Sequence, residues 1–278
     1  MPQQTLGVVT AVYHAVDPAQ LRRALESLAE QTRPPDDVVV VEDGPIGPGL
    51  MAVLDDPPVP LSRVALPVNR GSGPARQAGL RALSTRWVAI ADADDVSLPD
   101  RFEVQLAHLE SSGDAGVGAA MAEFSGTEAN VTATRRLPPE HDQIARRVLI
   151  NNPINHPTFM ADRQRVLDVG GYPNLPFLED YDLMARLVAS GARLHNLQQV
   201  LVLFRADDSM YNRRTGRELG RSEWRLQRNL HAYGLVGRSR MTVNYVLRSA
   251  FRMLPRWLLI RAYDVLLRER TACQGTPG

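Results

Sequence analysis

Residues 87–95 read WVAIADADD, an apolar run that ends in three carboxylates within four positions. The apolar part, Trp87–Ala91, has the length and composition of a buried strand. Asp92, Asp94 and Asp95 repel one another, so grouping them costs free energy unless a cation lies among them. Mg²⁺ and Mn²⁺ prefer oxygen ligands and commonly bridge carboxylates to substrate phosphates. The stretch therefore predicts a strand that ends at a divalent-metal site, with a solvated acidic loop or a helix N-cap as the alternatives.

The segments before residue 87 alternate between strand and helix patterns. Apolar runs of strand length occupy Leu6–Val12, Val38–Val41 and Val64–Val68. Helical spacing follows a suitable N-cap at Asp17, and a second helix is expected at about Ala75–Leu83. This alternation predicts an α/β fold of the Rossmann-like kind, with a mostly parallel central sheet and helices on both faces.

Further polar motifs are expected at the carboxyl ends of these strands, where open α/β sheets bind their ligands. Asp43 directly follows the second strand. Residues 69–76, NRGSGPAR, combine glycines with two arginines suited to phosphate but lack the P-loop pattern, so a flexible turn also explains them. Glu179 and Asp180 open a helix expected at Tyr181–Ala189, where they could cap the helix or supply a general base.

The second half of the chain is less regular. We expect a strand pair within Gly113–Phe124, a loop over Glu123–Pro138, a helix at Ile144–Leu149 and extended chain at Pro157–Met160. From Arg217 onwards the pattern is predominantly helical and basic.

The near-neutral charge of this 278-residue chain hides an asymmetry. All 32 basic residues are arginine; 17 of them, with 25 acidic residues, lie up to Phe204, and 15, with 6 acidic residues, follow. The body is therefore acidic and the C-terminal part basic, a distribution typical of proteins with a surface-binding tail.

Cysteine content and hydropathy limit the compartment. The single Cys273 excludes an internal disulfide framework and a multi-cysteine zinc site, which favours a reducing environment. No apolar segment reaches the roughly 18 residues of a membrane span, and no signal-peptide pattern precedes Leu6. We expect a cytoplasmic protein.

Taken together and in order, the motifs resemble the family 2 glycosyltransferases, inverting enzymes of the GT-A fold. The resemblance covers roughly residues 5–215 and is closest to bacterial transferases of exopolysaccharide, capsule and O-antigen assembly, of the amylovoran type. It rests on VEDG at 41–44, Asn69-x-Gly71 with Arg76, Asp92-x-Asp94-Asp95, NHPT at 155–158, Gly170-Gly171-Tyr172 and EDYDL at 179–183.

On the donor side, the resemblance implies a nucleotide-binding half at about residues 1–100. Asp43 matches the acid that hydrogen-bonds uracil, and Tyr13 would flank that base. Arg76 would face the nucleotide. The D-x-D pair implies Asp94 as a metal ligand and Asp92 as a contact to ribose and metal. The donor contacts expected from these matches are Tyr13, Asp43, Arg76, Asp92, Asp95 and Arg205, the last in a segment that closes over the diphosphate.

On the acceptor side, at about residues 101–215, Asp180 matches the catalytic base and Glu179 lies beside it. His156 lies in a stretch near the acceptor or the metal, where a structural hydrogen bond before Pro157 is an equal explanation. The sequence departs from the family pattern at Gln77, where Asn is usual. It departs again at residues 44–47 and at Asp207-Asp208.

The resemblance implies an enzyme that moves a hexose from a nucleotide sugar, with UDP-hexose as the expected donor, to a hydroxyl of a saccharide acceptor linked to polyprenyl diphosphate. Mg²⁺ or Mn²⁺ is the expected cofactor. A sugar nucleotidyltransferase and a non-catalytic nucleotide-sugar-binding relative are the alternatives. The first would need a basic, glycine-rich loop after the first strand, where residues 13–16 read YHAV.

Residues 216–278 are expected to form a basic, amphipathic helical tail. Arg248, Arg252 and Arg256 recur at helical spacing among aromatic and aliphatic residues, and Pro255 must interrupt the helix. This pattern favours contact with an anionic membrane surface, at the inner face of the cell membrane. Docking on the catalytic domain or a dimer contact are the alternatives. The acidic body and the absence of a recognisable module argue against nucleic acid.

Overall fold

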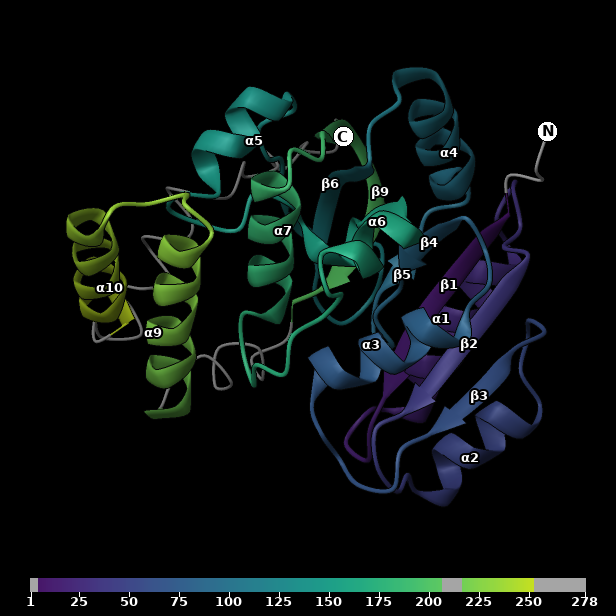
Figure 1. The fold of residues 1–278 in the computed structure, drawn as a ribbon. Coiled ribbons are helices and arrows are strands. Elements are labelled where there is room, and N and C mark those ends of the chain that lie inside the picture. The colour runs from purple at the N-terminus through teal and green to yellow at the C-terminus, as the bar shows by residue number, and fades with distance from the viewer. Residues whose placement is uncertain (1–4, 207–216, 253–278) are drawn as a thin grey trace, which may run out of the picture.

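Nine strands of the described chain, residues 5–206 and 217–252, form one sheet in this computed structural model (Figure 1). Their order is β3-β2-β1-β4-β8-β6-β9-β5, and β7 pairs with β6 outside this path. The strands are β1 (Leu6–Val12), β2 (Asp37–Glu42), β3 (Ser62–Ala65), β4 (Trp87–Ile90), β5 (Val96–Ser97), β6 (Gly116–Phe124), β7 (Val131–Arg135), β8 (Met160–Asp162) and β9 (Leu194–Arg205). The helices are α1 (Pro18–Ala29), α2 (Pro48–Asp55), α3 (Ser72–Ala82), α4 (Arg101–Ser112), α5 (His141–Arg147), α6 (Arg163–Asp168), α7 (Glu179–Ala189), α9 (Arg217–Ala232) and α10 (Arg238–Arg252), with a 3₁₀ turn at His156–Thr158.

The first four strands in the sheet order, β3, β2, β1 and β4, are parallel. Strands β2, β1 and β4 are buried between two layers of helices, whereas β3, at the edge of the sheet, is largely exposed. Val8 and Val38 point toward the apolar residues of α1, α2 and α4. Their neighbours Val9 and Val39 point to the opposite face, toward α3, α7 and α9. This alternation follows from the two-residue repeat of a strand. It confirms the expected α/β fold with helices on both faces.

Strand β8 is antiparallel to both β4 and β6, and β9 runs parallel to β6. Consequently β4, β6 and β9 point the same way, and their carboxyl ends share one edge of the sheet with those of β1 and β2. This brings Arg205, the last residue of β9, beside Asp95, whose Oδ1 accepts the Arg205 N–H at 2.9 Å. The same topology places the amino ends of β6 and β9 at the opposite edge.

Two expectations for the middle of the chain are wrong. Gly113–Phe124 contains one long strand, β6, rather than a pair, and the loop expected at Glu123–Pro138 contains β7. Strand β7 forms because β6 supplies its partners. The Thr132 hydroxyl donates to the Glu123 carbonyl, and the Arg135 guanidinium pairs with the buried Glu123 carboxylate at 2.7 Å.

The two described C-terminal helices pack onto the rest of the molecule: α9 lies beside α7, and α10 lies beside α9 (Figure 1). The Asn229 amide of α9 and the hydroxyl of Tyr233, the residue directly after α9, donate to Asp182 of α7 at 2.8 and 3.1 Å. From α10, the Asn244 amide donates to the Leu149 carbonyl. The expected helical extension is thus present over residues 217–252, and it is docked. Pro255, Arg256 and Cys273 lie outside the described residues.

Arg248, which the sequence placed on a basic stripe with Arg252 and Arg256, turns toward the protein. Its guanidinium pairs with Glu223 of α9 at 2.8 Å, donates to the Ile150 carbonyl, and lies 5.5 Å from the centre of the Tyr181 ring. Glu223 is fully buried. A buried carboxylate without a cationic partner is strongly destabilising, so Arg248 turns inward to pair with Glu223. Among the described helices, none is long and apolar enough to cross a membrane.

Candidate active site

The loop between β3 and α3 is fixed to the end of β2 by Asp43. Its Oδ1 accepts the Arg70 N–H at 2.7 Å and its Oδ2 accepts the Gly71 N–H at 2.9 Å. Gly71 precedes α3 with a positive φ of 90°. Gly44 has φ +83°, and a Cβ on it would lie 2.5 Å from the Asn69 nitrogen, so only glycine allows this approach. The aspartate that the family resemblance assigns to uracil therefore also orders the loop that begins α3.

Tyr13 follows β1 at the same edge of the sheet, where Val12 pairs with Glu42 at the end of β2. Its ring meets that of His14 edge-on, with 5.5 Å between the ring centres. Tyr13 and Asp43 thus follow adjacent parallel strands. The resemblance assigns the first to the side of the base and the second to a hydrogen bond with uracil.

Arg76 of α3 bridges two of the predicted site carboxylates. Its Nη2 donates to Asp92 Oδ1 at 2.8 Å, and its Nη1 donates to Glu179 Oε1 at 2.9 Å. The Ser72 hydroxyl also donates to Glu179 Oε1. The three residues of this bridge come from α3, from the turn after β4 and from the start of α7. The fold thus brings together three motifs, of which the first and the last lie about 100 residues apart in the sequence.

The two carboxylates that Arg76 bridges have pKa values shifted in opposite directions. Burial alone would raise the pKa of Asp92, but the Arg76 guanidinium, together with His156 and Arg101, outweighs burial and holds that pKa below its ordinary value. Burial and the neighbouring Asp180 raise the pKa of Glu179, although Arg76 opposes them. Asp92 is thus the firmly ionised member of the pair.

Asp95 faces the end of β9. Its Oδ1 accepts the Arg205 N–H, and its buried Oδ2 has no hydrogen-bond partner within the described chain. Burial, together with Asp94 and Asp92, raises the pKa of Asp95 well above its ordinary value. The Arg205 guanidinium donates to the Asp94 carbonyl at 3.2 Å and lies 4.6 Å from the centre of the Phe124 ring. Arg205 therefore lies beside the predicted metal aspartate, while the loop predicted to close over the diphosphate falls outside the described residues.

A buried arginine beneath this acidic turn was not assigned a role from the sequence. Arg101, at the start of α4, donates to the Ile90 carbonyl, the Ser97 hydroxyl and Gln105 Oε1. Burial lowers its pKa to about 10, against the opposing effect of Asp92 and Asp95. It still carries a positive charge at neutral pH and offsets part of the repulsion among the carboxylates. Its signal in the sequence is its position six residues after the acidic run.

The predicted base, Asp180, is oriented by a residue that the sequence did not single out. Asn152 donates its side-chain N–H to Asp180 Oδ2 at 2.8 Å, and the Tyr181 N–H reaches Oδ1. The preceding Leu178 has φ 67°, a left-handed conformation that is strained for a leucine. Asp180 is partly exposed, whereas Glu179 is buried. Of the two carboxylates, Asp180 is the more accessible.

His156 is buried, and its Nε2 lies 2.9 Å from the Tyr172 hydroxyl. The Tyr172 N–H in turn donates to Gln77 Oε1 at 2.7 Å. A Cβ on Gly171 would meet that same oxygen, so Gln77 would have to move, and the φ of 65° at Gly171 also favours glycine. Burial, reinforced by Arg76, lowers the pKa of His156 to about 4. This neutral histidine has a structural partner, and its contact with the acceptor stays a prediction.

With this geometry in place, comparison with known proteins decides the family. The model of the family described as "Glycosyl transferase family 2" matches residues 7–171. The chain belongs to glycosyl transferase family 2. The resemblance seen in its motifs is confirmed, and with it the prediction of a glycosyltransferase at the level of the family.

Relatives in the family extend over most of the chain. "Amylovoran biosynthesis glycosyltransferase AmsE" of Erwinia amylovora is 35% identical, over 90% of this chain and 94% of its own length. The "UDP-Gal:alpha-D-GlcNAc-diphosphoundecaprenol beta-1,3-galactosyltransferase" of Escherichia coli is 29% identical, over 90% of this chain and 91% of its own. The expected similarity to the amylovoran group is confirmed.

A solved structure shares the fold. S. aureus TarS 1–349 in complex with UDP-GlcNAc aligns with a TM-score of 0.63 at 16% identity, over 95% of this chain and 73% of that one. In another TarS structure, this chain spans 45% of the length. At this identity the likeness establishes the fold alone, and it agrees with the expected GT-A fold.

The low pKa of His156 predicts a loss of stability in acid. An unfolded histidine has a pKa near about 6.5, so between pH 6.5 and pH 4 the unfolded chain binds the extra proton. The contribution of the neutral His156 to stability is therefore complete above about pH 6.5 and is lost as the pH drops toward 4. From pH 7 to pH 5, His156 should remove about 2 kcal/mol from the free energy of unfolding.

Urea unfolding at both pH values measures this loss. His156→Gln should show a pH-dependent loss smaller by that amount, whereas His14→Gln, at an exposed histidine, should behave like the unaltered chain. Equal losses in all three proteins would contradict the burial of a neutral His156.

Proposed function

We propose that this chain is an inverting, metal-dependent hexosyltransferase. It would transfer a hexose from a UDP-linked donor to a hydroxyl of a saccharide linked to polyprenyl diphosphate, in the assembly of a cell-surface polysaccharide. The observation that carries the proposal is the Arg76 bridge, which joins the D-x-D turn to the carboxylate pair that contains Asp180. In this scheme residues 1–215 form the catalytic unit and residues 216–278 the basic tail.

Relatives support the choice of substrates. The E. coli relative is named for a UDP-galactose donor and a diphosphoundecaprenol-linked acceptor, and AmsE for amylovoran biosynthesis. The fold neighbour TarS has been solved with UDP-GlcNAc. These names make a UDP-sugar and a lipid-linked saccharide the first substrates to test.

The donor would lie across the carboxyl edge of the parallel strands. Tyr13 and Asp43 would contact the base, and Asp92 the ribose. Gly71 and the N-terminus of α3 would allow close approach of the diphosphate, because glycine leaves the backbone N–H groups accessible and a helix N-terminus favours anions. Arg76 and Arg205 would add positive charge on either side of the acidic turn.

The acidic turn suits a hard divalent cation. Its side chains offer only oxygen ligands, and the buried Asp95 Oδ2 lacks a hydrogen-bond partner among the described residues. A nearby cation would stabilise a buried carboxylate oxygen that has no hydrogen-bond partner. Asp94 and Asp92 would hold Mg²⁺ or Mn²⁺, which would stabilise the negative charge of the diphosphate electrostatically.

Asp180 would act as the general base. Its Oδ2 would take the proton of an acceptor hydroxyl, whose oxygen would form a bond to the anomeric carbon as the bond to the nucleoside diphosphate breaks on the opposite side. This gives inversion and leaves UDP as the product. Asn152 would hold Asp180 in position, and Glu179, which is buried and bonded to Arg76 and Ser72, would stay out of the proton transfer.

The alternatives have less support. A sugar nucleotidyltransferase does not fit membership of glycosyl transferase family 2. A relative that binds a nucleotide sugar without turnover would have no need of a carboxylate placed like Asp180, beside an amide that orients it. Measured turnover separates this second alternative from the proposal.

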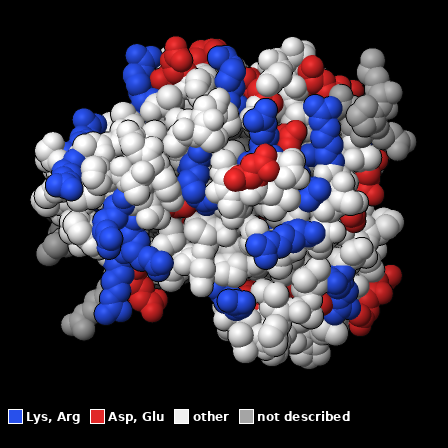
Figure 2. Space-filling model, in the orientation of Figure 1, with Lys and Arg blue, Asp and Glu red and all other residues white. Residues whose placement is uncertain are grey.

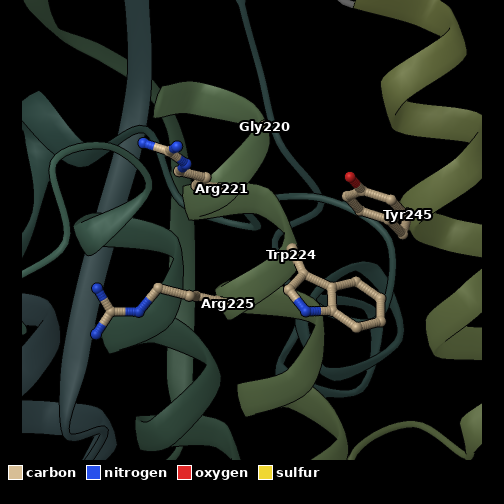
Figure 3. Close-up of a pocket in the computed structure, with 5 residues that line it drawn as sticks. All are labelled: Gly220, Arg221, Trp224, Arg225 and Tyr245. Carbon is tan, nitrogen blue, oxygen red and sulfur yellow. The ribbon is translucent and has the colours of Figure 1, made fainter. Parts of the chain in front are cut away.

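The tail would contact an anionic membrane surface through α9 and α10. Val243, Val246 and Leu247 form an exposed apolar stripe at helical spacing on α10. Trp224 of α9 and Tyr245 of α10 line a hollow of about 530 Å³ together with Arg221 and Arg225 (Figure 3). Figure 2 shows basic side chains gathered over this end of the molecule. Aromatic, aliphatic and arginine side chains together are typical of the membrane interface.

Replacing the base should abolish turnover without harming donor binding. Asp180→Asn should lower kcat by about 10²–10⁴-fold, the usual contribution of a general base. Its affinity for UDP, measured by calorimetry, should match that of the unaltered chain. Asp142→Asn makes the same change of charge at an exposed position and should leave both quantities unaltered. Turnover of Asp180→Asn within a few-fold of normal would remove Asp180 from this role.

Activity should depend on a divalent ion held at the acidic turn. Removal of metal with EDTA should abolish transfer, and Mn²⁺ or Mg²⁺ should restore it. Asp94→Ala should require much more metal for half-maximal activity, because a carboxylate ligand is lost. Asp56→Ala, at an exposed aspartate, is the control. Full activity in EDTA would refute the metal assignment.

The exposed stripe on α10 should contribute to membrane binding. The double variant Val246→Asp/Leu247→Asp should bind anionic phosphatidylglycerol vesicles at least about tenfold more weakly, since each buried aliphatic side chain contributes about 1.5–3 kcal/mol. Co-sedimentation measures the bound fraction, and Val68→Asp, at an exposed valine outside the tail, is the control. Equal sedimentation of the double variant and the unaltered chain would show that this stripe does not face lipid.

A further inference from the structure

A group of side chains of the kinds that bind metal ions lies at the edge of the sheet opposite the candidate active site. His108 is in the last turns of α4, Asp114 is in the link between α4 and β6, and His195 is the second residue of β9. Because β4, β6 and β9 run in the same direction, these amino ends of β6 and β9 lie at the opposite edge from Asp92–Asp95. The group is therefore separate from the proposed donor site.

The three side chains converge closely. Taking one ligand atom from each, all three atoms lie within 4.8 Å of one another. His108 Nε2 is 2.9 Å from Asp114 Oδ2, and the two imidazole rings are stacked with their centres 4.4 Å apart and their planes at 27°. Within the described residues, this is the group in which three such ligand atoms come together; the aspartates of the D-x-D turn do not form one.

The backbone around these residues fixes their approach. The Ala115 N–H donates to the Arg193 carbonyl, and the Asp162 N–H donates to the Ala115 carbonyl. These bonds hold the link that carries Asp114 against the start of β9. Asp114 is 7% exposed and His108 is partly buried, so the ligand atoms face an enclosed edge rather than open solvent.

A purely structural role accounts for only part of this arrangement. The His108–Asp114 hydrogen bond and a long contact of 3.4 Å from Arg193 to Asp114 would satisfy the carboxylate. Neither contact involves His195, whose ring is nevertheless placed against that of His108. Two imidazoles and one carboxylate, from three separate segments, form a donor set that one metal ion would satisfy at once.

We propose that His108, Asp114 and His195 bind a Zn²⁺ ion. Imidazole nitrogen suits Zn²⁺ far better than Mg²⁺, and two histidines with one carboxylate are an established ligand set for Zn²⁺. One carboxylate and two neutral imidazoles leave a net charge of +1 and a fourth position open to water. The bound ion would join α4, the α4–β6 link and β9, and so hold together the part of the sheet from which β6 and β9 run toward the active site.

Binding of Zn²⁺ to the untagged full chain tests this proposal. Cys273→Ser is used as the background, so that the thiol does not contribute, and excess Mg²⁺ is present to occupy the acidic turn. Calorimetry should show one Zn²⁺ per chain, and Co²⁺ in its place should give the visible absorption of a four-coordinate nitrogen–oxygen site. The midpoint of thermal unfolding should rise with Zn²⁺, because the ion binds the folded chain.

Variants decide between this group and the rest of the molecule. His108→Ala and His195→Gln should each weaken Zn²⁺ binding by at least about tenfold, since even changes beyond the direct ligands cost that much. His195→Gln keeps a polar side chain of similar size and remains informative if His108→Ala does not fold. His14→Ala, which removes an exposed histidine, and Asp94→Ala, which alters the acidic turn, should retain the site. Absence of stoichiometric Zn²⁺ in the background chain, or unaltered binding in both cluster variants, would overturn the proposal.

Discussion

Arg76 is the charge that allows two carboxylates from distant parts of the chain to lie at one point. It donates to Asp92 after β4 and to Glu179 at the start of α7, and all three side chains are largely withdrawn from water. Without this guanidinium two buried acids would face each other, which is costly because burial disfavours the ionised form. The relative placement of the D-x-D turn, α3 and the Glu179–Asp180 pair therefore depends on one arginine.

The same constraint explains how the acidic edge tolerates its density of charge. Several of its carboxylates have identifiable compensating groups: Asp43 accepts the backbone N–H groups of the α3 loop, Asp92 and Glu179 share the Arg76 guanidinium, and Asp180 accepts the Asn152 amide. Arg101 adds a buried positive charge beneath the turn. Asp95, with one oxygen unsatisfied, is the exception, and it lies where a cation is expected.

Helix α7 connects this edge to the C-terminal helices. Its first turn carries Glu179 and Asp180, while Asp182, one residue beyond Tyr181, accepts hydrogen bonds from Asn229 of α9 and from Tyr233, directly after α9, and pairs with Arg186. The tail up to residue 252 thus supports the element that positions the proposed base. A surface that faces lipid through α10 would be connected to the proposed base through a few hydrogen bonds.

Apolar periodicity and strand length are local properties, so the sequence alone was sufficient for the order of strands and helices in the parallel half and for the placement of Asp43 and Asp92–Asp95 at strand ends. The family followed from the resemblance of its ordered motifs to the family 2 glycosyltransferases. The sequence could not reveal which polar side chains contact one another across the chain. The contacts of Asn152 with Asp180, of Arg248 with Glu223 and of His108 with His195 join segments 25 to 87 residues apart in the chain. Strand β7 was missed for the same reason, since its short polar pattern becomes a strand only where β6 supplies hydrogen bonds and the buried Glu123 a charge to neutralise. Local pattern determines which elements form, whereas only packing determines which polar groups lose water together and must therefore satisfy one another.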